Sequence, residues 1–334
     1  MIKRLAVTMG DPAGIGPEVL AKSLCALGEA TRHLVIFGSP TLLEKTADQL
    51  RLHCPSWTVL STLRDLNACE GLAIFDPSPL DLDTFVFGQA SAAGGQASVQ
   101  YFEQAVEACL SGRVAGVVTC PINKVAVQLA GYVGDIGHQE ILARLTRAPL
   151  TATLLMTTGL KVVHLSTHLS LGDAVRFVKK DILIEKSRLA LDSLRAWGYA
   201  SPSLAMAALN PHGGEGGLIG REEVDEIAPA VEYLVSECQE DVRGPFPADT
   251  VFNRAIAGEF DAVLALYHDQ GHIPIKVKDF ERSVTATLGI PFVRTSVDHG
   301  TAYDLVGQGI ADATSLQEAL RVAQLMLEAR LPEF

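Results

Sequence analysis

Short apolar runs alternate along the chain with longer stretches in which apolar residues return at helical spacing. Apolar runs of about four to eight residues are typical of buried strands, and a spacing of three and four residues is typical of helices. The runs predict strands at 5–9, 33–38, 72–75, 116–120, 151–157, 161–167, 204–209, 283–289 and 292–296. Helical spacing predicts helices after residue 16 and at 41–52, 94–110, 181–197, 221–237 and 316–327. This alternation predicts an α/β fold with parallel β-α-β units.

Three apolar runs end at histidines. The run that starts at Ala262 stops at Tyr267-His268, LKVVHLSTH stops at His168, and SLAMAALNPH stops at His212. In open α/β sheets, ligands bind just beyond the carboxyl ends of strands. One interpretation is therefore a divalent metal held by the three imidazoles, with an open position for a substrate oxygen. The other is three unrelated histidines bonded to backbone carbonyls, and the spacing leaves both open.

Five other features have both a functional and a structural interpretation. The glycine-rich loop 10–16 could approach a ligand or form a tight strand-to-helix turn. Lys124 starts a helix against the helix dipole, which favours a role beyond solvation. His138 could bind a ligand or cap a helix, and Asp249 could act in catalysis or serve as a helix N-cap. Arg294, between apolar residues, could bind a carboxylate or phosphate, or form a structural ion pair.

Composition narrows the class of protein. The chain has 334 residues, 48% of them hydrophobic, and 29 glycines, which is typical of an α/β enzyme with two domains or with one large domain and a split core. Its formal net charge of −12 argues against non-specific binding to nucleic acid and against attachment to anionic membranes. An anionic substrate must therefore meet a local group of cations.

Cysteine usage and hydropathy favour a cytoplasmic protein. The six cysteines include no C-x-x-C pair and lie mostly in apolar segments, which favours reduced thiols over a disulfide framework. The first residues carry no cleavage-type signal, and no apolar run reaches the roughly 18 to 20 residues of a membrane-spanning helix. We therefore expect a soluble, cytoplasmic protein.

A series of motifs resembles a known family over nearly the whole chain. In order, they are GDPAGIGPE, PINK, GHQE, STHLSL, NPHGGEGG, PADTVF, YHDQGH, the lysine at 276 and GIPFVRTSVDHGTAYDL. The sequence resembles the 4-hydroxythreonine-4-phosphate dehydrogenase family of vitamin B6 biosynthesis, which is similar in fold to isocitrate and isopropylmalate dehydrogenases. This resemblance implies two α/β/α domains with a cleft between them, and a homodimer whose active sites are shared between subunits. The corresponding division is a cofactor-side domain at 1–135 plus 280–334 and a metal- and dimer-forming domain at 136–279.

The resemblance also implies roles for particular residues. The metal ligands fall on His168, His212 and His268, with His268 supplied by the partner subunit, and the metal would be Zn, Mg, Co or Mn. The substrate-binding positions fall on His138, Gln139, Lys276, Thr285 and Arg294. The cofactor would be NAD, with NADP as the alternative, at an adenosine-side loop formed by His299, Gly300, Thr301 and Ala302. For the general base, the sequence offers Asp249 and Lys124.

The implied reaction is NAD- and metal-dependent oxidation and decarboxylation of 4-phosphohydroxy-L-threonine to 3-amino-2-oxopropyl phosphate, in pyridoxal phosphate biosynthesis. Two positions depart from the family pattern: Gln139 replaces the threonine of G-H-T-E, and Thr285 replaces the asparagine of V-N-I-T. A paralogue that oxidises 4-phospho-D-threonate, 4-phospho-D-erythronate or a carboxylated cis-dihydrodiol therefore stays open. A metallohydrolase or a non-catalytic metal-binding protein would explain three histidines, but not the resemblance to dehydrogenases through 298–304.

Overall fold

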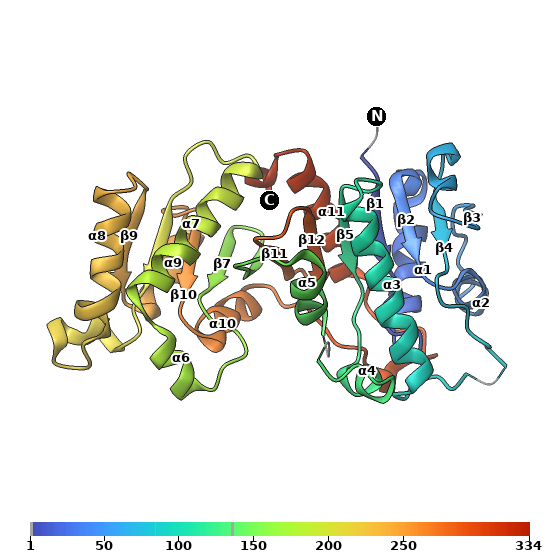
Figure 1. Ribbon diagram of the computed structural model, residues 1–334, viewed down its shortest axis with the longest axis horizontal. Coiled ribbons are helices and arrows are strands. Elements are labelled where there is room, and N and C mark those ends of the chain that lie inside the picture. Colours follow the sequence, from blue (N-terminus) through green and yellow to red (C-terminus); the bar gives the residue numbers. More distant parts are fainter. Residues whose placement is uncertain (1–2, 84, 135–136) are drawn as a thin grey trace. The chain divides into compact units, whose positions relative to one another are not determined.

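The structure, a computed structural model, describes residues 3–83, 85–134 and 137–334. Residue contacts divide the chain into two compact units, Met1–Ala148 with Ile290–Ala323 and Pro149–Gly289 with Gln324–Phe334. The domain boundary that the sequence predicts at residues 135 and 136 lies outside the described residues. Each unit contains a sheet and helices, which confirms the α/β fold class (Figure 1).

Within its described residues, the first unit contains six parallel strands in the order β3-β4-β2-β1-β5-β12. They are β1 (Leu5–Thr8), β2 (Leu34–Phe37), β3 (Thr58–Leu60), β4 (Ala73–Phe75), β5 (Gly116–Thr119) and β12 (Val293–Val297). The strands β1, β2, β5 and β12 are buried throughout, as expected for parallel strands covered on both faces. Because β1, β5 and β12 are neighbours, the loops that follow them meet at one edge of the sheet.

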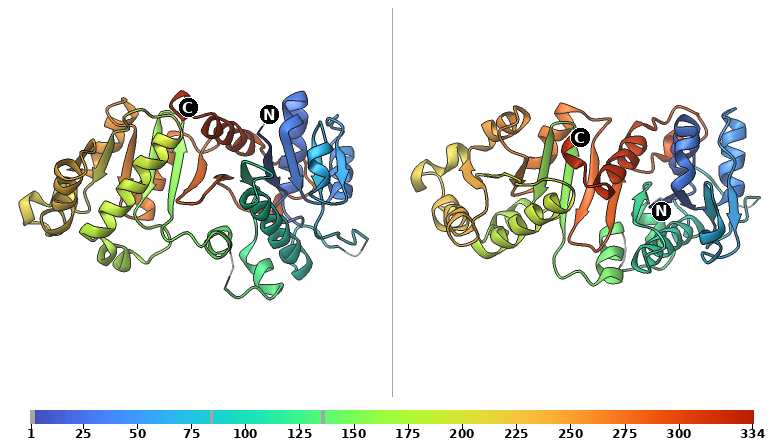
Figure 2. Two further views of the ribbon diagram at one scale, coloured as in Figure 1. Left: turned by 45° about the horizontal axis from the view of Figure 1, so that its top comes forward. Right: turned by 90° about the horizontal axis from the view of Figure 1, so that it is seen from above.

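Helices lie on both faces of these strands. They are α1 (Gly16–Leu27), α2 (Pro40–Gln49), α3 (Ala92–Leu110), α4 (Lys124–Leu129) and α5 (His138–Thr146), and α11 (Thr314–Leu327) begins in this unit. Helix α3 packs against β1, β2 and β5, and the right view of Figure 2 shows α1 and α2 on the opposite face. Ser39 and Ser91 cap α2 and α3 by accepting hydrogen bonds from the first-turn N–H groups of Leu42 and Gly94.

The second unit contains six strands in the order β11-β6-β7-β10-β8-β9. They are β6 (Ala152–Thr157), β7 (Leu160–His164), β8 (Leu204–Ala207), β9 (Val242–Phe246), β10 (Ala262–Ala265) and β11 (Val284–Leu288). Strand β6 is antiparallel to both β7 and β11, whereas β7, β10, β8 and β9 are parallel. The carboxyl ends of β7, β10 and β8 therefore lie side by side.

The helices of the second unit are α6 (Leu171–Phe177), α7 (Lys180–Ala196), α8 (Ala228–Ser236), α9 (Ala248–Ile256) and α10 (His268–Lys278). Figure 2 shows α7 and α8 on one face of the strands and α9 and α10 on the other. Alternate residues of β7, β8 and β10 form a buried cluster with α9 and with Ile275 of α10. This packing fixes the start of α10, and with it His268, at the end of β10.

Most predicted elements are confirmed within one to a few residues, including the β6–β7 hairpin through Thr158-Gly159. The sequence did not predict the short strands β3 and β9, nor the helix α10 that follows the apolar run from Ala262. All six cysteines are free thiols. None of the helices in the described ranges is long and apolar enough to cross a membrane.

Candidate active site

Three loops of the first unit interlock at the carboxyl ends of β1, β5 and β12. The backbone N–H of Asp11 donates to the carbonyl of Pro121 at 2.9 Å, and the N–H of Ile15 donates to the carbonyl of Thr301 at 3.0 Å. The Asn123 side-chain amide lies 3.4 Å from the Thr301 hydroxyl. The segments GDPAGIG, PINK and HGTA, which are far apart in sequence, therefore form one structure at the edge where α/β enzymes bind ligands.

Asp11 joins these loops through its carboxylate. The side chain is buried and accepts hydrogen bonds from the N–H of Ala13 at 2.9 Å and from the Tyr303 hydroxyl at 2.6 Å. Burial raises the pKa of Asp11, and the hydrogen bonds from Tyr303 and Ala13 oppose that rise. A Cβ on Gly14 would lie 2.9 Å from the Thr301 Cβ, so this position needs glycine for packing. These contacts hold residues 10–16 in a tight strand-to-helix turn.

The predicted cofactor loop carries a buried, unsatisfied nitrogen. The Nδ1 atom of His299 lies 3.0 Å from the Gly300 carbonyl, so an N–H at Nδ1 would donate to it and leave Nε2 as an acceptor. Nε2 is buried and has no hydrogen-bond partner among the described residues. Ala302 adopts a left-handed conformation, with φ of 40°. An N–H group of a ligand could satisfy this acceptor.

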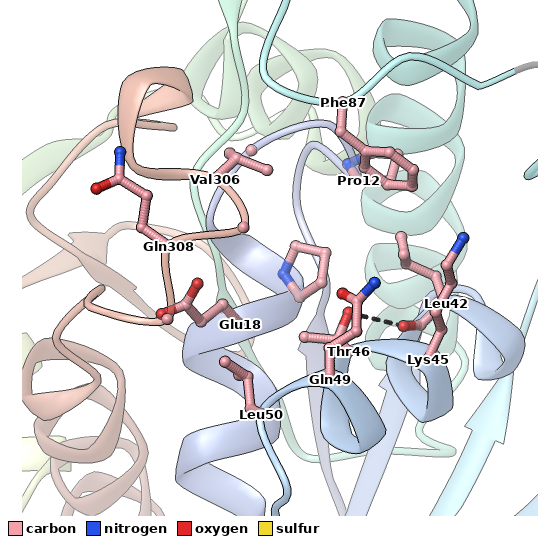
Figure 3. A pocket seen from close by; sticks show the side chains of 14 residues that line it. Pro12, Glu18, Leu42, Lys45, Thr46, Gln49, Leu50, Phe87, Val306 and Gln308 are labelled. Atoms are coloured by element: carbon pink, nitrogen blue, oxygen red, sulfur yellow. Dashed lines mark hydrogen bonds between the residues drawn. The ribbon is translucent and has the colours of Figure 1, made fainter.

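A pocket of about 470 Å³ lies in the same unit (Figure 3). Residues of α1, of α2 and of the segment 306–309 line it, together with Pro12, Gly14 and Phe87. Its wall combines apolar side chains with Glu18, Lys45 and other polar groups, which is typical of a small-molecule site. Glu18 already accepts hydrogen bonds from the Lys22 ammonium and the Ala311 N–H, both at 2.8 Å.

Lys124 is the first residue of α4. Asn123 caps this helix by accepting hydrogen bonds from the N–H groups of Val125 at 2.9 Å and Ala126 at 3.1 Å. The lysine is exposed, and its Cε lies 3.8 Å from the point that a Cβ on Gly137 would occupy. The ammonium arm therefore lies beside the first turn of α5, next to His138 in the chain.

His138 is the first residue of α5 but does not cap the helix, because Gly137 occupies the N-cap position and no side-chain cap bond forms. Its ring packs edge-on against Phe102, with ring centroids 4.5 Å apart. The Nε2 atom is buried and lacks a hydrogen-bond partner within the described ranges. Burial, and secondarily the charge of Arg294, lowers the pKa of His138 well below 6.5. The ring is therefore neutral at physiological pH.

Arg294 lies on β12, opposite Val117 of β5, and is only 4% exposed. Its Nη2 donates a hydrogen bond to the Thr119 hydroxyl at 2.9 Å, a neutral group. Burial lowers the pKa of Arg294 to about 10, so the guanidinium stays charged at neutral pH. A buried cation whose charge acts on His138 is well suited to bind an anionic group.

The three predicted metal ligands all follow adjacent parallel strands of the second unit. His168 is exposed in the loop after β7. His212 follows β8 in a left-handed segment, with φ of 53°, and its Nδ1 lies 3.1 Å from Oε1 of Glu215. His268 begins α10, and its Nδ1 lies 2.7 Å from Oδ1 of Asp269.

Among residues 3–83, 85–134 and 137–334, no group of three or more His, Cys, Asp or Glu side chains is arranged to hold a metal. The donor chemistry nevertheless fits a metal. An N–H at Nδ1 of His212 or His268 would donate to the adjacent carboxylate, which orients the ring and leaves Nε2 to bind the ion.

Asp249, Lys276 and Thr285 also lie in the second unit. The predicted N-cap role of Asp249 is wrong, because Pro247 occupies the N-cap position and Asp249 lies inside the first turn of α9. Its carboxylate is exposed, and α9 lies beside the segment that carries His212. Lys276 is in the last turn of α10, and half-buried Thr285 lies opposite Leu155 of β6.

Four residues that contact the predicted site residues were not predicted from the sequence. Glu215 and Asp269 contact histidine rings, Phe102 supports His138, and Tyr303 holds Asp11. Glu215 and Asp269 could have been predicted, because each is a carboxylate within three residues of a predicted metal-binding histidine. Phe102 and Tyr303 carried no local signal, because their partners are distant in sequence.

Comparison with known proteins places these features in a family. The family model described as "Pyridoxal phosphate biosynthetic protein PdxA" matches residues 29–323. The D-threonate 4-phosphate dehydrogenase of Cupriavidus necator is 41% identical over 329 residues, with 95% of each chain covered. The 4-hydroxythreonine-4-phosphate dehydrogenase of Beijerinckia indica is 40% identical over 319 residues, covering 96% of this chain and 94% of the relative.

Solved structures with a similar fold support the same family. A 4-hydroxythreonine-4-phosphate dehydrogenase from Klebsiella pneumoniae has a TM-score of 0.87 and 37% identity, covering 97% of this chain and 99% of its own. A terephthalate 1,2-cis-dihydrodiol dehydrogenase from Burkholderia xenovorans has a TM-score of 0.68 and 28% identity, covering 97% and 98%. The resemblance drawn from the motifs is confirmed, and a dehydrogenase acting on a small molecule is favoured over a metallohydrolase. The chain belongs to the PdxA family, whose members include 4-hydroxythreonine-4-phosphate and D-threonate 4-phosphate dehydrogenases.

Proposed function

We propose that this dehydrogenase oxidises and decarboxylates a 4-phosphorylated, four-carbon 3-hydroxy acid with NAD and a divalent metal. The observation that carries the proposal is the buried guanidinium of Arg294 in the first unit, whose charge helps to lower the pKa of His138, a side chain whose buried Nε2 has no hydrogen-bond partner among the described residues. Together they offer N–H donors and one positive charge to an anion. The exposed ammonium of Lys124, beside the same helix start, adds a second charge.

Of the two main substrate candidates, we favour 4-phospho-D-threonate over 4-phosphohydroxy-L-threonine. Relatives named for either substrate are similarly close, at 41% and 40% identity, so overall identity does not decide. The two acids differ at C2, which carries a hydroxyl in the first and an amine in the second. Thr285 replaces an asparagine whose carbonyl could accept hydrogen bonds from an ammonium, and Gln139 replaces a threonine. The hydroxyl of Thr285, in place of that amide, supports the 2-hydroxy acid.

The cofactor half of the site belongs to the first unit. NAD, when bound, supplies the hydride acceptor. The buried acceptor nitrogen of His299 fits an N–H of the adenine, and the backbone of Gly300 to Ala302 would lie next to the bound cofactor. The pocket in Figure 3 begins at Gly14, which packs on Thr301, and its volume of about 470 Å³ suits the adenosine part of a dinucleotide. We propose NAD rather than NADP, since the pocket wall combines one lysine, Lys45, with one acidic residue, Glu18.

The metal half of the site uses His168, His212 and His268, with zinc as the first candidate from the all-imidazole ligand set. A divalent ion, when bound, polarises the substrate hydroxyl and carbonyl oxygens. The chain's contribution is to orient the rings, through the contacts of His212 with Glu215 and of His268 with Asp269. For the group that removes the hydroxyl proton, we propose Lys124 or Asp249, both exposed and so able to exchange protons with water. Lys276 and Thr285 would contact the substrate from the second unit.

We propose that the enzyme is a homodimer and that His268 acts in the partner's active site. The absence of a three-ligand group within the described part of one chain agrees with this arrangement. Helix α10, which begins with His268, also exposes apolar side chains at Ile273 and Val277, 57% and 81% exposed, with Phe280 at 67% just beyond. Such an apolar stripe is typical of a surface that another subunit covers.

The test is NADH formation by metal-loaded enzyme with three substrates in parallel: 4-phospho-D-threonate, 4-phosphohydroxy-L-threonine and 4-phospho-D-erythronate. The proposal expects turnover that EDTA abolishes, with the highest kcat/KM for 4-phospho-D-threonate. Higher kcat/KM with 4-phosphohydroxy-L-threonine would place the enzyme in pyridoxal phosphate synthesis and overturn the substrate preference. Turnover of a carboxylated cis-dihydrodiol alone, the substrate type named for the Burkholderia xenovorans neighbour, would overturn the phosphate role of Arg294.

A further inference from the structure

Three imidazoles of the second unit form a continuous column from the core to the surface. The ring of His164, on β7, is 1% exposed, and its centroid lies 4.6 Å from that of His272 on α10. The ring of His272 in turn stacks on His268, with centroids 3.6 Å apart and an interplanar angle of 10°. The side chain of His268, at the end of the column, is 44% exposed. A surface histidine is thus supported by two rings that lead into the core.

The middle ring is fixed in place by its own contacts. Nδ1 of His272 lies 3.1 Å from the backbone carbonyl of His268, one helical turn earlier, so an N–H at Nδ1 would donate to it. The next residue back, Gly271, allows α10 to approach β7. A Cβ there would lie 2.3 Å from Nε2 of His164 and 2.8 Å from Cγ1 of Val162. Any other residue at 271 would push the helix away and separate the rings.

His268 is therefore held on two sides. Asp269 contacts its Nδ1 edge at 2.7 Å, and His272 covers one ring face. The edge that carries Nε2 is the one left for a ligand. Without the stack, the ring would sample several χ1 and χ2 rotamers, and binding an ion would have to fix them at a cost in free energy. The column removes much of that cost in advance.

We infer that His272 is a positioning residue, which holds the imidazole of His268 in the orientation that binds the divalent metal. The inference rests on the proposed function, because it takes His268 as a metal ligand. His272 would affect metal affinity without binding the metal, because it acts through the side chain of His268. It also explains why a glycine precedes His272, since the column needs α10 close to β7.

The experiment measures the Zn²⁺ dissociation constant of the full-length protein in its native oligomeric state, by competition with a chelating indicator. The absorption spectrum of the Co²⁺-loaded protein reports the ligand geometry in the same samples. The variants are His272→Ala, His272→Phe, which keeps an aromatic face, and His268→Ala. His53→Ala, at an exposed histidine of the first unit, is the matched control. Circular dichroism and the Tm of the metal-free variants verify folding.

We expect His272→Ala to weaken Zn²⁺ binding by about 10- to 100-fold, the usual effect of removing a residue that orients a metal ligand. It should also change the Co²⁺ spectrum, and His272→Phe should restore most of the affinity. Wild-type affinity in His272→Ala, with binding lost in His268→Ala, would overturn the inference and leave the metal site intact. Wild-type affinity in His268→Ala would instead overturn the proposed role of His268 itself. Equal losses in His272→Ala and His272→Phe, with unchanged spectra, would also overturn the stacking argument.

Discussion

The ring of Phe102 meets the imidazole of His138 edge-on, with centroids 4.5 Å apart and an interplanar angle of 74°. Phe102 is fully buried in α3, so it provides a rigid support for the first residue of α5. The contact holds the unsatisfied Nε2 of His138 in one place.

Phe102→Leu should weaken substrate binding as well as lower the stability of the fold. A loss of about 1.4 kcal/mol in positioning His138 corresponds to about a tenfold rise in KM. Phe37→Leu is the matched control, because Phe37 is also fully buried and also has an edge-on aromatic partner, Phe75. Both variants should lose stability in urea, whereas only Phe102→Leu should raise KM. Equal KM values in the two variants would count against the support role.

Arg294→Lys should raise KM for the phosphorylated substrate at least tenfold, on the order of the 1.5–3 kcal/mol of a charge-assisted hydrogen bond. Lysine keeps the charge but cannot reproduce the planar fork that donates to Thr119 and to an anion together. The measurement is KM for the phosphorylated substrate and for its dephosphorylated analogue. A proportional loss with both compounds would argue that Arg294 does not contact the phosphate.

The stability of the metal-free enzyme should fall below pH 6.5. Burial, and secondarily His272, lowers the pKa of His164 to about 3 from its ordinary 6.5. Between these values the unfolded chain binds a proton that the folded chain does not. The free energy of unfolding should therefore be highest above pH 6.5 and fall with decreasing pH, by up to about 1.4 kcal/mol per unit for this group.

His164→Asn should remove this contribution to the pH dependence. Urea unfolding at several pH values between about 7.5 and 5.5, in EDTA, gives the slope for wild type and variant. The free energy of unfolding of the variant should change less steeply with pH than that of the wild type. Some pH dependence should remain, because the pKa of buried His138 is lowered as well. Identical slopes would show that the pKa of His164 is not lowered in the folded state.

Tyr303→Phe should lower the free energy of unfolding by about 1–3 kcal/mol, because it removes a donor from the buried carboxylate of Asp11. It should also raise KM for NAD, since Asp11 joins the loop 10–16 to the segment that follows the proposed cofactor loop. Tyr233→Phe, at a 40% exposed tyrosine of the second unit, is the control and should change neither quantity. A variant that loses stability but keeps its KM for NAD would separate Tyr303 from cofactor binding.

Two inactive variants should restore activity when mixed. If His268 completes the partner's site, a dimer of one His268→Ala chain and one His212→Ala chain has one intact site. Random reassociation should then give about a quarter of wild-type turnover, because about half of the dimers carry one intact site of two. The mixture is unfolded and refolded together, with each variant alone as control. No recovery, with dimers confirmed by light scattering, would mean that each site uses its own chain's histidines.

Much of the fold followed from local sequence. Apolar runs predicted nearly all strands, because a strand covered on both faces must be apolar along its length. Motifs at the ends of those runs predict His168, His212 and His268 as metal ligands, since parallel topology brings the loops after neighbouring strands to one edge of the sheet. The cap at Asp249 was wrong because capping depends on where the chain turns into the helix, and here the helix begins earlier, after Pro247.

The sequence by itself determined the family, the α/β class and the residues with chemical potential, because periodicity and motif order are local properties. Only the tertiary structure decided which of those residues are prepared for chemistry. His138 is neutral because burial, and secondarily the charge of Arg294, lowers its pKa, and its ring is held by Phe102, which is distant in sequence. His268 is held because Gly271 lets α10 approach His164 on another element. Burial, ring stacking and pKa arise from contacts between distant segments, and no local pattern records them.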